Sequence, residues 1–209
     1  MRNLKIKNQN GRSMIEMLGV LAIIGVLSVG GIAGYSKAMM KYRINKTIEQ
    51  ITLIAGNVRT FFATQGNYDG VSCGSDENKN FVSYSSCAIA KKAKLFPDEM
   101  LTIADGTITN IENAFGGKSA IHELEDGKTF MVAFNEIPME ACIELGSYDW
   151  SRANATSIGL TAFNGNLQSG NYSLYYTHSS LPVDMNIIIT ECSNITSKNY
   201  NIVFSVSFK

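Results

Sequence analysis

Histidine, tryptophan, proline and an excess of charge of either sign are all lacking or scarce in this sequence. The 209 residues include two histidines, one tryptophan and three prolines, and 18 basic side chains balance 18 acidic ones. A dedicated nucleic-acid-binding protein normally has a clear basic excess, so we predict no specific nucleic-acid partner. Low-complexity segments and solenoid-type repeats are also missing. The length and composition therefore suit one folded domain with an extension.

The sequence contains the start or the end of known catalytic and metal-binding motifs, but each of them lacks a required residue. His122-Glu123 starts like a zinc-protease helix motif, but Asp126 occupies the place of its second histidine. Gly117-Lys118-Ser119 resembles the end of a phosphate-binding loop, but Glu112 occupies the place of its first glycine. The cysteines form no C-x-x-C pair. We therefore expect no enzymatic activity, no cofactor and no metal.

A long uncharged apolar run is the strongest feature that is present. Residues 1–11 are polar and basic, and from Met17 to Tyr35 the chain reads MLGVLAIIGVLSVGGIAGY. As a helix this run is about 30 Å long, which matches the hydrocarbon core of a bilayer. Basic residues before such a run place the N-terminus on the cytoplasmic side. Apolar residues then recur at helical spacing from Ile44 to Phe62, and Gly66 is suited to end the helix near residue 65.

Glu16 stands at the entrance to the apolar run. A carboxylate within a membrane costs about 2.5–3.5 kcal/mol on insertion scales, so such side chains are rare and usually paired. At the headgroup boundary the same side chain would stay hydrated and have no role. An ordinary secretory signal is the alternative, because Ser36-Lys37-Ala38 has the form that signal peptidase cleaves, which would start the mature chain at Met39. The length of the run and its glycines favour a helix that packs in a membrane instead.

The segment Gly11-Arg12-Ser13-Met14-Ile15-Glu16, followed by the apolar run with Ala22-Ile23-Ile24-Gly25, resembles the class III signal of type IV prepilins. The resemblance implies that a prepilin peptidase cuts after Gly11 and that the new amine pairs with Glu16 of a neighbouring subunit. The family normally methylates that amine and has Phe, Met or Leu where this sequence has Arg12. Out of water, such an ion pair fixes how one helix lies against the next.

Beyond residue 66, short apolar runs alternate with Gly, Asn, Ser and Asp. The patterns predict two short helices and three strands: helices at Ser86–Leu95 and Pro138–Leu145, and strands at Thr129–Phe134, Asn186–Thr190 and Tyr200–Lys209. The last strand alternates so regularly that we expect it to bury one face. The predicted fold class is therefore α+β, with an antiparallel sheet packed on the second half of the N-terminal helix.

Four cysteines allow three pairings, and their even number in an exported chain favours disulfides. Three motifs, Leu95–Met100 (LFPDEM), Asn113–Gly117 (NAFGG) and Ile137-Pro138 followed by Cys142, occur in the order seen in type IVb pilins of the conjugative thin-pilus group. That resemblance implies a bond between Cys142 and Cys192. Cys73 and Cys87 are then left to form a local clasp.

We therefore predict a prepilin leader at 1–11, a helix at 12–65 with a membrane segment at about 17–35, and a pilin head at 66–209. The expected protein is a structural subunit of a type IV pilus, stored in the inner membrane and then polymerised into an extracellular filament for adhesion, conjugation or DNA transfer. Its expected partners are further copies of itself, other pilins, prepilin peptidase and the inner-membrane assembly platform. The alternatives are a minor pilin or secretion-system pseudopilin, and a membrane-anchored binding protein with an ordinary signal anchor.

Overall fold

The computed structural model describes residues 14–74, 87–124, 126–163, 172–196 and 201–209. It divides into two units, residues 1–41 and residues 42–209, and each is treated by itself below. One helix, α1 (Met14–Phe62), contributes to both units. The predicted helix is thus present, and its end lies three residues before the expected one. The predicted leader, with Gly11 and Arg12, lies outside the described residues.

In the first unit, α1 is an apolar helix whose side chains from Met14 to Ala38 are not buried by any other part of the described chain. All side chains from Met14 to Ala38 are exposed. The most apolar 18-residue window of α1 has a mean hydropathy of 2.2, and none of that window is buried. By length and composition, α1 is the one helix of the described chain that could cross a membrane.

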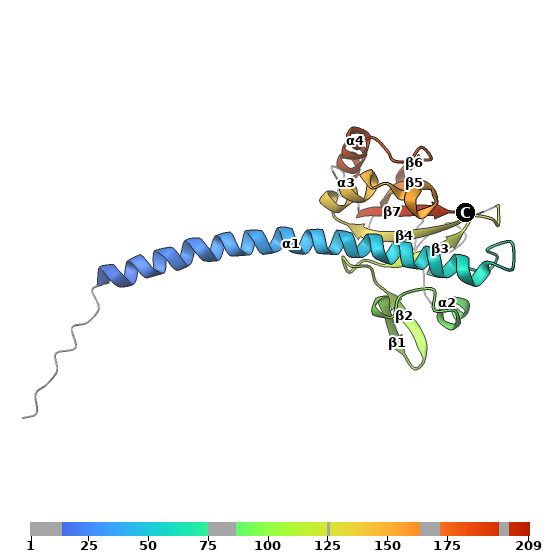
Figure 1. The fold of residues 1–209 in the computed structure, drawn as a ribbon, viewed down its shortest axis with the longest axis horizontal. Helices are drawn as coiled ribbons and strands as arrows, with labels where there is room; N and C mark the ends of the chain where they lie inside the picture. Colours follow the sequence, from blue (N-terminus) through green and yellow to red (C-terminus); the bar gives the residue numbers. More distant parts are fainter. Residues whose placement is uncertain (1–13, 75–86, 125, 164–171, 197–200) are drawn as a thin grey trace, which may run out of the picture. The chain divides into compact units, whose positions relative to one another are not determined.

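The second unit, the head, is built on a five-stranded antiparallel sheet (Figure 1). The strand order is β3-β4-β7-β5-β6, and the strands are β3 (Ser119–Glu123), β4 (Phe130–Ile137), β5 (Ala155–Phe163), β6 (Tyr172–His178) and β7 (Asn201–Phe208). The central strand β7 pairs with β4 through Phe130↔Phe208 and with β5 through Ile158↔Val206. The predicted strands at Thr129–Phe134 and Tyr200–Lys209 correspond to β4 and β7, although Tyr200 itself lies outside the described residues, and β3, β5 and β6 are additional.

A small second sheet precedes the main one in the chain. It is a hairpin of β1 (Leu101–Ala104) and β2 (Thr107–Ile111). Its two-residue turn, Asp105-Gly106, has positive φ angles of 49° and 75° at its two residues. Asp-Gly is a preferred sequence for such turns, because both residues tolerate the left-handed region. The short helix α2 (Ala88–Lys92) and the 3₁₀ turn η2 (Asp98–Met100) come before this hairpin.

The helical part of α1 that belongs to the head packs on one face of the main sheet. Phe62, Tyr68, Phe130 and Phe208 form a chain of ring contacts with centroids 5.8, 4.7 and 5.5 Å apart. Cross-strand partners point to the same face of a sheet, so Phe130 and Phe208 identify the face that α1 covers. Ile44, Ile51, Ile54 and Val58 of α1 are all buried, as the helical spacing of apolar residues predicts.

The opposite face of the sheet is also buried, contrary to the expectation that β7 buries one face only. Val203 of β7 is 5% exposed and packs in a cluster with Ala120, Met131 and Ala133, against Leu124. Ser205, on the same face, is 4% exposed. The alternation in the sequence is therefore between wholly apolar residues on the α1 face (Ile202, Phe204, Val206 and Phe208) and Val203 with two serines on the other face, and not between buried and exposed positions.

The predicted strand at Asn186–Thr190 is wrong, because these residues lie in the helix α4 (Met185–Thr196). The Asp184 carboxylate accepts a hydrogen bond from the Asn186 backbone N–H at 2.8 Å, which stabilises the start of the helix. Ile188, Cys192 and Ile195 then recur at helical spacing and are buried. The predicted helix at Pro138–Leu145 corresponds to α3 (Met139–Ser147), with Pro138 at its N-cap. The 3₁₀ turn η3 (Trp150–Ala153) follows it.

Candidate functional site

The apolar part of α1 in the first unit is the candidate assembly segment. Glu16 lies in the first turn of α1 and is exposed. A carboxylate in the first turn interacts favourably with the helix dipole. Ser28 and Ser36 donate their hydroxyl hydrogens to the carbonyls of Ile24 and Ile32, at 2.8 and 3.0 Å, so that both polar side chains are satisfied within the helix. Such hydroxyls suit a helix that is surrounded by lipid or by other helices.

The glycines of this segment have open space around them. A Cβ atom added at Gly19, Gly25, Gly30, Gly31 or Gly34 would have no neighbour within 4 Å. Nothing in the described chain therefore requires glycine at these positions. Glycines allow helix backbones to approach closely in membranes, so the requirement is expected to come from neighbouring helices.

Both disulfides lie in the head. Cys142 bonds Cys192 with a Cα–Cα distance of 6.2 Å, and Cys73 bonds Cys87 with a Cα–Cα distance of 4.9 Å. The first is the bond that the resemblance implied, and the second is the local clasp expected of the two remaining cysteines. Cys142 and Cys192 are fully buried, and each of the four cysteines is at most 4% exposed.

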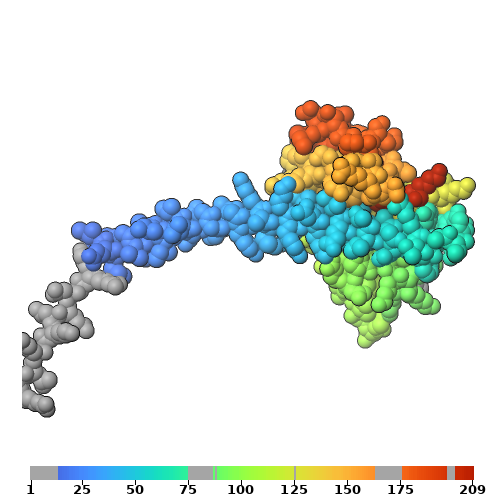
Figure 2. All heavy atoms as spheres, viewed as in Figure 1, coloured from blue at the N-terminus to red at the C-terminus, as the bar shows by residue number. Residues whose placement is uncertain are grey.

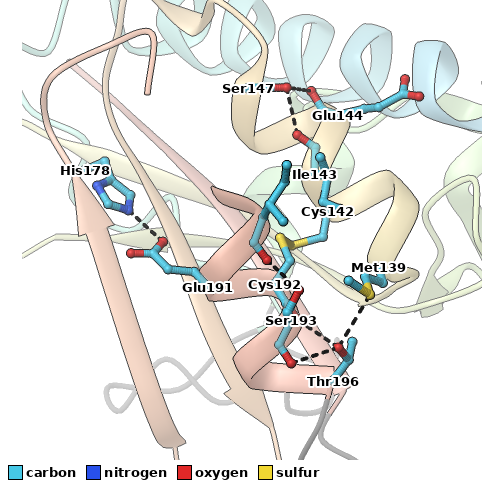
Figure 3. The surroundings of a disulfide bond; sticks show 11 residues. Met139, Cys142, Ile143, Glu144, Ser147, His178, Glu191, Cys192, Ser193 and Thr196 are labelled. Carbon is cyan, nitrogen blue, oxygen red and sulfur yellow. Dashed lines mark hydrogen bonds and ion pairs between the residues drawn. A yellow bond between two sulfur atoms is a disulfide. The ribbon is translucent and has the colours of Figure 1, made fainter. Parts of the chain in front are cut away.

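The Cys142–Cys192 bond joins two antiparallel helices, α3 and α4 (Figure 3). The pairs Gly146 with Ile188, Cys142 with Cys192, and Met139 with Thr196 run in opposite directions along the two helices. A Cβ atom added at Gly146 would lie 2.6 Å from Ile188, so the glycine permits this close approach. The helix was predicted to end at Leu145, but α3 continues through Gly146 to Ser147.

A polar contact links the edge strand β6 to α4, next to the disulfide. Nε2 of His178 lies 2.7 Å from a carboxylate oxygen of Glu191, and both side chains are mostly buried (Figure 3). No pattern in the sequence indicates this pair, because His178 is isolated and Glu191 directly follows Asn186–Thr190, which was predicted to be a strand. A correct helical assignment would have placed Glu191 on the buried side with Ile188 and Cys192.

Arg59, near the end of α1, donates hydrogen bonds to three backbone oxygens. Its acceptors are the oxygens of Lys209, Ala153 and Asn154, at 3.1, 3.0 and 2.8 Å. Its guanidinium carbon also lies 5.1 Å from the ring centroid of Phe208. One side chain therefore connects α1 to the end of β7 and to the turn before β5. Only its helical position was visible in the sequence.

A second polar group ties α1 to the segment before β1. Lys46 contacts Glu99 at 2.8 Å and Glu49 at 3.1 Å. The hydrogen bond from Lys46 lowers the pKa of Glu99. Gln50, only 4% exposed, accepts a hydrogen bond from the Ala114 backbone N–H at 3.2 Å. These contacts attach the region of β1 and β2 to the helix.

The NAFGG motif forms a turn that is closed by its own asparagine. The Asn113 side-chain oxygen accepts hydrogen bonds from the backbone N–H groups of Phe115 and Gly117, at 2.8 and 3.2 Å. Its amide nitrogen donates to the Asn135 carbonyl at 2.8 Å. A Cβ atom at Gly117 would lie 2.1 Å from that carbonyl oxygen, so only glycine fits there. The motif is therefore structural, and it fixes the chain against β4.

Across the part of the chain that the structure describes, no group of three or more His, Cys, Asp or Glu side chains is arranged to hold a metal ion. A hollow on the head has a volume of about 390 Å³ and is lined by residues at the end of β4, the start of α3, the end of α4 and the start of β7. Its walls include Glu136, Pro138 and Ile202. Glu136 is its one ionisable side chain, which is too little to identify a ligand.

A family model described as PilS N terminal matches residues 41–207. Among solved structures, the crystal structure of type IV b pilin from Salmonella typhi is similar at a TM-score of 0.49 and 15% sequence identity, and the alignment covers 79% of this chain and 99% of that chain. None of the curated proteins matches the chain. The family match covers almost the whole head, in which a long helix packs on an antiparallel sheet. The chain therefore belongs to the PilS family.

Proposed function

We propose that this chain is a structural subunit of a type IV pilus, held in the inner membrane before assembly and polymerised through the N-terminal part of α1. The observation that carries the proposal is the unburied apolar helix from Met14 to Ala38, which has Glu16 at its start. A helix that is apolar on all sides must be surrounded on all sides, first by lipid and then by helices of neighbouring subunits.

In this proposal the leader at 1–11 is removed by prepilin peptidase, which cuts between Gly11 and Arg12. The new amine carries a positive charge at the cytoplasmic edge of the membrane, where Glu16 of an adjacent subunit is its counter-ion. Leaving Glu16 unpaired in an apolar environment is strongly unfavourable, so the pair sets the register between helices. The assembly platform of the inner membrane would then move each subunit into the growing filament.

The intact mass and the N-terminal peptide of the protein recovered from cells test this proposal. We expect an N-terminus at Arg12, together with filaments in the medium that contain this chain. Glu16→Ala should leave cleavage intact and abolish filaments, and Glu16→Asp should retain more filament than Glu16→Ala because it keeps the charge. A chain that begins at Met39, or that stays uncut at Met1, would show that it is an anchored or secreted protein.

The composition of purified filaments separates a major subunit from a minor one. We expect this chain to be the most abundant protein in them. Filaments that consist mostly of another pilin would make it a minor subunit or a pseudopilin. Adhesion and conjugation are the roles proposed for the filament, and a strain that lacks this chain should lose at least one of them in attachment and mating assays.

A further inference from the structure

Charge is distributed very unevenly along this chain. From Thr129 to Thr196, which includes β4, α3, β5, β6 and α4, the sequence contains six acidic residues and a single basic one, Arg152. Helix α1 has the opposite balance, with five basic residues against two acidic ones. The neutral total therefore conceals an acidic part and a basic part, which favours association between copies of the chain.

The acidic part includes an exposed surface that is also apolar. We call it the α3–α4 surface: Glu136, Met139 and Glu140 around the start of α3, next to Thr196 at the end of α4. Glu136, Met139 and Glu140 are exposed, and the apolar Met139 is 39% exposed. In Figure 2, α4 and the neighbouring helix lie at the surface of the head. The exposed side of α4 between Met185 and Thr196 carries no charged side chain.

This surface is held rigidly. The disulfide Cys142–Cys192 and the close contact of Gly146 with Ile188 fix α3 against α4. The His178–Glu191 pair fixes α4 to β6. Because its side chains lie on elements that are already ordered, binding a partner here costs little conformational entropy.

A complementary set of side chains lies on α1, just beyond the apolar run. Lys37 and Lys41, which we call the lysine pair, are both exposed and are four residues apart, so they project from one side of the helix. Tyr35, 67% exposed, adds an aromatic ring next to them. The lysine pair and Tyr35 therefore offer positive charge beside an apolar surface, and the α3–α4 surface offers negative charge beside one.

We propose that, in the filament, the α3–α4 surface of one copy binds the lysine pair and Tyr35 of a second copy. This inference rests on the proposed function, because it concerns contacts within the filament. Two different surfaces of one chain that bind each other form a heterologous contact, and such contacts continue into open helical polymers. The apolar side chains supply buried area, and the opposite charges orient the two copies and disfavour other pairings.

Charge reversal tests the contact in a strain whose wild-type chain forms filaments, with each variant replacing the wild-type chain. Glu136→Lys combined with Glu140→Lys, and Lys37→Glu combined with Lys41→Glu, should each lower the amount of filament by about tenfold, equivalent to roughly 1.4 kcal/mol. Combining all four substitutions should restore filaments to within about threefold of wild type, because the charges are again opposite. Precursor cleavage, pilin abundance and the disulfides, read by mass and by non-reducing electrophoresis, verify that each variant is processed and folded.

The matched control uses two other exposed lysines. Lys91 and Lys92, on α2, are exposed and equal in number to the lysine pair. Lys91→Glu with Lys92→Glu should neither reduce filaments strongly nor rescue Glu136→Lys with Glu140→Lys. If this control set rescues and the lysine pair does not, the partner surface is α2 and the proposal is wrong. The proposal is equally wrong if the variant with all four substitutions makes no more filament than either double variant.

A covalent test remains informative if the charge variants fail to fold. Ala38→Cys, next to the lysine pair, and Met139→Cys are placed in one chain, and filaments are oxidised mildly. We expect disulfide-linked dimers and longer ladders under non-reducing conditions, and fewer when Ala38→Cys is combined with Ile103→Cys on the exposed hairpin strand β1. Equal cross-linking of the two pairs would overturn the contact. Wild-type cells without any filament would instead reject the proposed function itself.

Discussion

Residues 14–41 and the head-forming residues 42–62 of α1 are both helical and both rich in apolar side chains, but those side chains differ in their surroundings. From Met14 to Ala38 every described side chain is exposed, whereas in the head Ile51, Ile54 and Val58 are at most 1% exposed. The head segment is apolar along one stripe only, and a sheet covers that stripe. The N-terminal segment is apolar all round, so no single surface could cover it. Nothing in the described chain covers it.

The contrast predicts that changes inside the head act on the stability of a single subunit, whereas changes in the N-terminal segment act on assembly alone. The largest effect is expected from the buried disulfide. Cys142→Ser with Cys192→Ser should lower the free energy of unfolding of the head by about 3–5 kcal/mol, because the bond closes a long loop and its side chains are buried. Urea denaturation of the detergent-solubilised protein, followed by fluorescence of the buried Trp150, measures this change.

An unchanged urea midpoint in that variant would mean that packing alone holds α3 against α4. Cys73→Ser with Cys87→Ser is the comparison, since the sequence separation of this pair is 14 against 50. The shorter loop predicts a smaller loss of stability.

The next effect compares glycines in three surroundings. Gly146→Ala should destabilise the head by about 1–3 kcal/mol, because the new methyl group overlaps the buried Ile188. Gly56→Ala, in the head part of α1 with open space around it, should instead stabilise by up to about 1 kcal/mol. Gly25→Ala should leave head stability unchanged and reduce filament formation. Thermal unfolding and filament yield, measured for all three variants, would show whether the two segments really respond separately.

A smaller effect is expected where the end of α1 binds the rest of the head. Arg59→Met keeps the apolar stem of the side chain and removes its three hydrogen bonds to backbone oxygens. Because the guanidinium is partly exposed, the loss should be about 1–2 kcal/mol. Arg59→Lys should recover only part of it, since one ammonium group does not reproduce the planar fork of donors. Full recovery by lysine in a chemical denaturation experiment would show that charge matters more than geometry.

The smallest effect concerns acid. The hydrogen bond from Lys46 lowers the pKa of Glu99. The ionised pair therefore stabilises the head at any pH above the ordinary pKa of a glutamate. This stabilisation is lost as the pH falls through the lowered pKa. Because the Glu99 side chain is 46% exposed, its contribution should stay below about 1 kcal/mol. Glu99→Gln should therefore be slightly less stable at neutral pH and equal to wild type in acid. A constant difference across the titration would contradict this account.

The predictable parts of the fold were those where one local pattern was reinforced by its packing. Helix α1 follows from helical spacing, and β4 and β7 follow from β-branched and aromatic runs. Asn186–Thr190 shows the limit, because its three consecutive isoleucines favour a strand. Packing of Ile188 on Gly146 and the disulfide at Cys192 favour the helix instead, and tertiary contacts override local propensity.

Other parts were missed for identifiable reasons. The hairpin of β1 and β2 had a usable signal, since Asp105-Gly106 lies between two short β-branched runs. Strand β5 includes Gly159, Ala155 and Ala162, which weakened its pattern. At the candidate assembly segment, charge, spacing and hydropathy pointed to Glu16 without any structure. The contacts of Arg59 and of His178 with Glu191 join residues far apart in the sequence, and no local pattern indicates such pairings.

The two disulfides also determine what remains together after a break in the backbone. One encloses the chain between Cys73 and Cys87, and the other encloses the chain between Cys142 and Cys192, which carries β5 and β6. A single protease cut inside either loop adds one water to the mass but releases no fragment until the disulfide is reduced. In the proposed filament, a subunit cut in this way would stay covalently joined to its N-terminal helix.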